Sequence, residues 1–186
     1  GQYMTVAGHI SGSGGLALSL SGNNSNQIMH LAGENSFSGG MTVNQGLLRF
    51  ASTANLGTTK TMSFSSGGGT GLSILGTEIT SLSDFTFTFN NTPLNFDIQD
   101  PANVFTWDKN YNSTFNSAGG VVLTKSGRGT MVVTVAQSYN NTNSGGIGTN
   151  LSGGTLQIDY GAGGSLVSGN RVAFQGGSLY LEGSST

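Results

Sequence analysis

Short runs of alternating apolar and small polar residues recur along this chain, and glycine punctuates each run. The clearest stretch spans residues 119–159, and the same order of elements occurs earlier in the chain. The run 46–50 precedes the run 154–158 by 108 positions, and a Ser-Gly-Gly run at 38–40 precedes another at 144–146 by 106. Such self-similarity predicts a repeat architecture. We place the related units near residues 14–58 and 119–160.

The alternation has the period of β-strands, and no segment fits the helical period. In the run 85–89, for example, Phe85, Phe87 and Phe89 share one face, so we expect one buried and one solvent-facing side. The predicted strands cover residues 3–6, 16–20, 28–31, 41–43, 47–50, 62–64, 72–75, 85–89, 94–98, 104–107, 121–124, 130–135, 155–158, 172–174 and 178–181.

Coils are favoured over hairpins as the way these strands are joined. Hairpins commonly use Asn-Gly or Asp-Gly turns, and the sequence contains neither dipeptide. Asparagine tolerates the left-handed conformations that polar corners need, and asparagines occur at suitable spacing at 22–24, 90–91, 110–112 and 140–141. We therefore predict an all-β fold, a right-handed parallel β-helix or a closely related β-solenoid. At about three strands per coil, the chain would form roughly seven or eight coils.

The pattern resembles the autotransporter-associated β-strand repeat of bacterial passenger regions. Three motifs carry the resemblance: Lys125, Gly127, Gly129, Thr130 and Met131; Phe37, Ser38, Gly39 and Gly40; and Gly154, Thr155 and Leu156. The resemblance covers nearly the whole chain, and it implies a structural or adhesive stalk segment of a bacterial cell-surface or extracellular protein. An enzymatic role is not expected from it.

Composition excludes several other functions. Six Lys and Arg stand against eight Asp and Glu, so no basic face exists for nucleic acid. Cysteine is absent, which excludes disulfides and thiolate zinc sites. No apolar run is long enough for a membrane-spanning helix in this segment. His9 and His30 are predicted to face solvent, and we expect neither a metal site nor a cofactor.

A cluster of acidic and aromatic residues at 84–111 is the strongest candidate for a ligand site. Trp107, Tyr111 and Asp108 are predicted to bind a ligand such as a glycan. Paired carboxylates also serve glycoside hydrolysis, so a polysaccharide-degrading β-helix is the alternative. The acids in question are Asp84, Asp97, Asp100 and Asp108. Solvated surface positions are the simpler interpretation of these acids, and we assign no catalytic residue.

The expected partners follow from the predicted architecture. Residues 176–181 form a further Gly-Ser-Leu strand, so we expect the chain to be a single solenoid segment, 1–186, of a longer repetitive protein. Neighbouring coils or other copies of the protein would stack on its ends, which allows fibres or a sheath to form. Surface glycans or a host matrix are the other expected partners.

Overall fold

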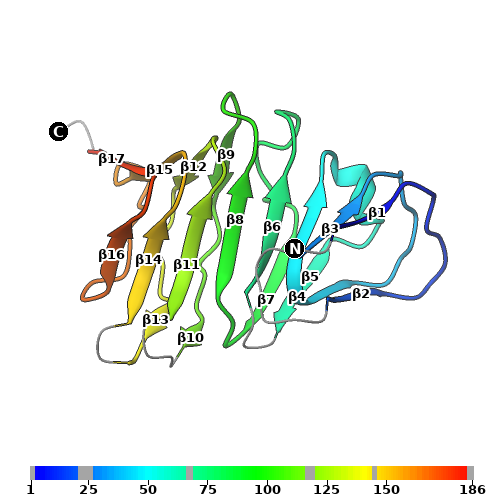
Figure 1. The fold of residues 1–186 in the computed structure, drawn as a ribbon, viewed down its shortest axis with the longest axis horizontal. Coiled ribbons are helices and arrows are strands. Elements are labelled where there is room, and N and C mark those ends of the chain that lie inside the picture. The colour runs from blue at the N-terminus through cyan, green and yellow to red at the C-terminus, as the bar shows by residue number, and fades with distance from the viewer. Residues whose placement is uncertain (1–2, 21–26, 66–68, 116–119, 144–145, 184–186) are drawn as a thin grey trace.

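The chain folds into stacked strands with almost no helix (Figure 1). The computed structural model describes residues 3–20, 27–65, 69–115, 120–143 and 146–183. Its one helix in this range is a short 3₁₀ turn, η1 (Thr53–Leu56). The strands are β1 (Tyr3–Val6), β2 (Leu16–Ser19), β3 (Ile28–Leu31), β4 (Met41–Phe50), β5 (Thr61–Ser65), β6 (Thr70–Ile74), β7 (Thr86–Asn90), β8 (Leu94–Ile98), β9 (Val104–Trp107), β10 (Thr114–Phe115), β11 (Val121–Ser126), β12 (Thr130–Val133), β13 (Asn140–Asn141), β14 (Ile147–Leu151), β15 (Thr155–Asp159), β16 (Arg171–Phe174) and β17 (Ser178–Glu182).

All strand pairs are parallel, and they form the faces of a solenoid. Sheet A runs in the order β1-β3-β4-β6-β8-β11-β14-β16, and sheet C in the order β9-β12-β15-β17. Sheet B joins β2, the first half of β4, β5 and β7, and the short pair β10-β13 takes the same place in later coils. From β8 to β14 the chain passes repeatedly from sheet A to sheet C, to β10 or β13, and back to sheet A. Eight strands in sheet A correspond to about seven turns, which confirms the predicted β-solenoid.

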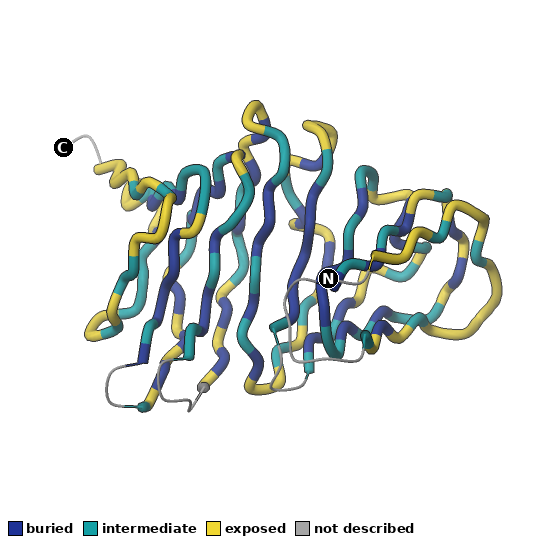
Figure 2. Tube along the Cα trace, in the orientation of Figure 1, coloured by how far each residue is buried: buried dark blue, intermediate teal, exposed yellow. Residues whose placement is uncertain are grey.

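Alternate residues of each strand point into the coil and stack into ladders that are largely apolar. One inward ladder of sheet A contains Met4, Met29, Leu48, Leu72, Phe96, Lys125, Leu151 and Phe174. Residues between the first and last coils are buried there, whereas the end coils are exposed (Figure 2). Each fully buried Leu, Ile or Phe contributes roughly 1.5–3 kcal/mol. The interior of the stack therefore supplies most of the stabilisation.

Polar corners connect the faces, as the sequence predicts in part. Asn91 has a left-handed φ of 46°, the conformation that asparagine tolerates best at a corner. Asn35 and Asn55 stack at another corner, where both side chains donate to the Gly33 carbonyl. The predicted corner at 22–24 lies outside the described residues. The corner predicted at 140–141 is instead the strand β13, where Asn141 is buried and donates to the Gly120 carbonyl.

Two of the differences from the predicted strands are informative. The runs 41–43 and 47–50 form one strand, β4, because Gly46 adopts a φ of 90° and bends the strand from sheet B into sheet A without ending it. Strand β14 is absent from the prediction because its inward residue Thr149 is polar. The Tyr139 hydroxyl pairs with the Thr149 hydroxyl in the core, which makes this inward position tolerable.

The two runs that lie 108 residues apart in the sequence do not occupy equivalent positions of the coil. Leu48 lies in sheet A, whereas Leu156 lies in sheet C. Both residues point inward, and both are buried. The matching motifs therefore share an alternation of strand and turn rather than a place in the coil.

Among the described residues, no helix is long and apolar enough to span a membrane.

Candidate functional site

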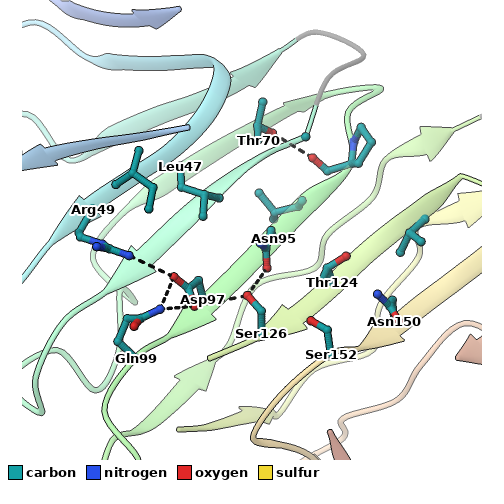
Figure 3. A pocket seen from close by; sticks show the side chains of 15 residues that line it. Leu47, Arg49, Thr70, Asn95, Asp97, Gln99, Thr124, Ser126, Asn150 and Ser152 are labelled. Atoms are coloured by element: carbon teal, nitrogen blue, oxygen red, sulfur yellow. Dashed lines mark hydrogen bonds and ion pairs between the residues drawn. The ribbon is translucent and has the colours of Figure 1, made fainter. Parts of the chain in front are cut away.

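A groove of about 630 Å³ crosses the outer face of sheet A (Figure 3). Much of its lining consists of outward residues of β4, β8, β11 and β14, and β6, which lies between β4 and β8, contributes Thr70. Strand register aligns the outward positions of sheet A into two ladders. The first contains Leu47, Gly71, Asn95, Thr124 and Asn150, and the second contains Arg49, Ser73, Asp97 and Ser126. The groove is therefore a direct product of coil stacking.

Asp97 lies at the centre of the groove and is only 6% exposed. The Ser73 hydroxyl donates to its Oδ2 at 2.7 Å, and Gln99 Nε2 lies 2.6 Å from both carboxylate oxygens. Arg49 Nη2 lies 3.7 Å from Oδ2, and Arg49 Nε donates to the Ser73 hydroxyl. These partners compensate the charge of a carboxylate that would otherwise be costly to bury. The solvated position expected for Asp97 is wrong, because Asp97 points outward from sheet A but its neighbours cover it.

The other half of the groove is polar and uncharged. The Ser126 hydroxyl donates to Asn95 Oδ1 at 2.8 Å. Asn150 Nδ2 donates to Gln175 Oε1 at 3.0 Å, while the buried Asn150 Oδ1 has no hydrogen-bond partner among the described residues. An unpaired buried acceptor carries a desolvation cost that a ligand or water can relieve. This end of the groove is thus prepared to accept a hydrogen-bond donor.

Trp107 and Tyr111, predicted as ligand-binding residues, lie in the core instead. Trp107 is 2% exposed and packs against Phe87 and Phe96, with ring centroids 5.2 and 4.6 Å away. Tyr111 is fully buried, its hydroxyl donates to the Thr92 carbonyl, and burial raises its pKa well above the usual value. Burial contradicts the prediction for both rings, because neither presents a face to solvent. The alternation within β9 already pairs Trp107 with the inward Phe105, and this signal pointed to the core.

The remaining predicted acids do not meet in one site. Asp108 is partly exposed, and its carboxylate lies 4.0 Å from Lys109 Nζ. Asp84 pairs at the surface with Lys60, and Asp100 accepts from the Ala102 amide within a turn. None of these three lines the groove that contains Asp97.

Neither histidine lines the groove. His9 is exposed and contacts the Ser36 hydroxyl and the Glu34 carbonyl. His30 is half-buried beside Tyr3, and burial together with the positive charge of Arg49 lowers its pKa. Across the described ranges, no group of three or more His, Cys, Asp or Glu side chains is placed to hold a metal ion.

Lys125 occupies an inward position of sheet A, directly behind the groove. Its neighbours in the ladder are Phe96 and Leu151, and it is fully buried. Its ammonium donates to the carbonyls of Ser126 at 2.5 Å and Gly153 at 3.3 Å. Burial lowers its pKa to about 8, and the nearby Asp97 charge opposes that shift only in part. Lys125 therefore bonds backbone carbonyls at a corner between two coils, although burial disfavours the charged form of its side chain.

The lowered pKa of Lys125 predicts how stability changes with pH. Between the folded pKa of about 8 and the ordinary value of 10.5, the unfolded chain holds a proton that the folded chain has released. Stability due to Lys125 therefore rises with pH across this window. Relative to Lys125→Met, the wild type should gain roughly 2 kcal/mol between pH 7 and pH 10. Urea unfolding of both proteins at the two pH values checks this. Both proteins contain the same tyrosines, so the effect of tyrosine ionisation on stability cancels in the comparison. Parallel pH profiles would contradict it.

By its structure the protein belongs to the class of parallel β-solenoids built from repeats, with a polar groove on one side. The family model of the passenger-associated-transport-repeat then matches residues 28–50 and 123–158. This confirms the resemblance to autotransporter passenger repeats, and repeats of this family imply a surface or secreted protein. The two matched segments lie within the repeat units predicted near 14–58 and 119–160. Comparisons with curated proteins and with solved structures gave no match.

Proposed function

We propose that this segment is a non-catalytic stalk of a bacterial surface or extracellular protein, which holds adhesive surfaces away from the cell. The observation that carries this proposal is the uninterrupted inward ladder of sheet A, which packs each coil on the next. Closely packed coils resist bending, because any bend must open side-chain contacts between neighbours. The match to passenger repeats supports the same role.

A non-catalytic role is favoured over polysaccharide degradation by the state of the acids. Glycoside hydrolysis needs two carboxylates facing one substrate. Asp97 is the only acid among the residues described as lining the groove, and Arg49, Ser73 and Gln99 already engage it. A reducing-sugar assay on plant and bacterial polysaccharides should therefore detect no hydrolysis.

Both end coils expose residues that are buried in every other coil. At one end Met4 is 45% exposed, and at the other Phe174 is 60% and Leu181 54% exposed. Strands β1, β16 and β17 also leave one edge without a partner strand among the described residues. Apolar ends with open strand edges favour stacking on another coil. We propose that, in the isolated chain, a second copy supplies that coil.

The isolated 186-residue chain is accordingly expected to associate end to end as its concentration rises. Phe174→Lys places a charge on the end surface and should shift the association to about tenfold higher concentration or more. Val104→Lys is the matched control, because Val104 is 51% exposed on the side of the solenoid. Sedimentation velocity over a concentration series measures the shift. A monomer at every concentration, or equal effects of both variants, would exclude end-to-end stacking.

A further inference from the structure

The groove on sheet A is not needed by a stalk. Stacking depends on the inward ladders, whereas most of the groove lining consists of outward residues. Its volume of about 630 Å³ lies within the range of ligand-binding clefts. Five parallel strands at about 4.8 Å spacing give it a length of about 19 Å along the axis of the solenoid. A linear ligand lying along that axis would meet similar groups at each coil.

The chemistry of the groove selects an uncharged ligand. Arg49 and Asp97 are the only charged residues among those described as lining it, and they pair with each other. The polar residues beyond this pair carry hydroxyl or amide groups, which both donate and accept hydrogen bonds. On β8, β11 and β14 they are Asn95, Thr124, Ser126 and Asn150. A ligand rich in hydroxyls matches such a surface, because each hydroxyl also donates and accepts.

Asn150 provides a specific anchor at one end of the groove. Its side chain lies on the groove wall, and the residue is 7% exposed (Figure 3). Nδ2 is engaged by Gln175, so Oδ1 is the group left without a partner. A hydroxyl that donates to Oδ1 would relieve the cost of this buried acceptor. The unpaired Oδ1 of Asn150 thus favours a ligand that places a hydrogen-bond donor at this position over non-specific hydration of the groove.

Apolar residues also line the groove, at several points along it. Ile28 and Leu47 lie at the β3–β4 end, Pro93 precedes β8, and Val121 begins β11. These aliphatic groups suit the C–H faces of a sugar ring, which need an apolar contact beside the hydroxyl contacts. The combination of a polar ladder and aliphatic patches matches a saccharide more closely than a purely polar solute.

Peptides and polyanions fit the groove poorly. A peptide that adds a strand needs an open sheet edge, but β6, β8 and β11 are each paired on both sides. Nucleic acids and acidic polysaccharides need an excess of cations, and Arg49 is already compensated. A neutral chain avoids both difficulties.

We propose that the outer groove of sheet A binds a neutral glycan segment along the axis of the solenoid. Hydroxyls of the glycan pair with Asn95, Thr124, Ser126 and Asn150, and its C–H faces contact the aliphatic residues of the lining. The site would supply the adhesive part of the proposed function. The stacking of end coils is tested separately by sedimentation velocity, and the non-catalytic role by the reducing-sugar assay, so the failure of those proposals is distinguishable from the failure of glycan binding.

The probes are neutral linear oligosaccharides of glucose, mannose, galactose and N-acetylglucosamine, with oligogalacturonate as the charged counterpart. Binding to immobilised probes is measured for the wild type and three variants. Thr124→Trp fills the groove from an outward, half-buried position, and Asn150→Leu removes the anchoring amide. Gln157→Trp is the matched control, because Gln157 is an outward residue of sheet C. Thermal melts establish that each variant is folded.

We expect the wild type to bind at least one neutral probe, with an affinity unchanged from about 50 to about 500 mM NaCl. Thr124→Trp should abolish this binding, Asn150→Leu should weaken it about tenfold or more, and Gln157→Trp should leave it intact. Three results would overturn the proposal: no binding of any neutral probe at millimolar concentration, tighter binding of oligogalacturonate, or equal binding by folded Thr124→Trp and the wild type.

Discussion

Leu156→Asp is expected to destabilise the protein by roughly 4 kcal/mol or more. Leu156 is fully buried on β15, where its ladder neighbours are Met131 and Leu179. An aspartate at this position would lose the apolar contacts and would bury a carboxylate with no partner in the ladder. Since small domains are stable by only about 5–15 kcal/mol, most of the stability is lost. Urea unfolding followed by circular dichroism measures the change.

Gln157→Asp is the control for this prediction, one residue along the same strand. Gln157 points outward and donates to Glu182 Oε2. The substitution exchanges that hydrogen bond for a mild repulsion at the surface, so a loss below about 1 kcal/mol is expected. Equal damage from the two substitutions would show that the inward and outward positions of β15 are assigned incorrectly.

Gly127→Ala is the second change with a large expected effect, at about 3 kcal/mol or more. Gly127 has a φ of 73°, and an added Cβ would lie 2.1 Å from the Ile98 carbonyl oxygen of the preceding coil. Alanine would therefore combine left-handed strain with a backbone overlap between coils. Neither can relax without separating the two coils at this corner. Thermal and urea unfolding both report the loss.

Gly76→Ala separates the two causes. Gly76 also has a left-handed φ, at 61°, but no atom lies within 4 Å of its added Cβ. Gly76→Ala therefore introduces backbone strain alone, and we expect it to lower the free energy of unfolding by about 1 kcal/mol. If Gly127→Ala proved no worse than Gly76→Ala, the close contact between coils at Ile98 would not be a determinant of stability.

The sequence predicted the solenoid because most coils follow a simple alternation. Phe87 and Phe89 pack against the core as their period-2 spacing indicates. Strand β14 was missed because Thr149 faces inward, where its tertiary partner Tyr139 is ten residues away. Alternation reports burial on average, and it fails where a polar side chain is satisfied inside the core.

The candidate site was harder to predict than the fold. Trp107 was chosen for its chemistry, although its inward position on β9 placed it in the core. The groove residues are individually ordinary hydroxyls and amides, and only the strand register brings them together. That register depends on the number of residues in each corner, and composition does not determine it. Asn95 and Thr124, for example, become neighbours across 28 intervening residues.

Parallel stacking also determines how the protein responds to tension along its axis. The hydrogen bonds between neighbouring coils run along that axis, so a pulling force acts directly on them. One coil separates equivalent positions by about 25 residues, as between Tyr3 and Ile28. Release of a single coil would therefore lengthen the chain by up to about 85 Å while the remaining coils stay folded. A stack of coils of this kind, placed under load, would extend stepwise and absorb work with each coil that is released.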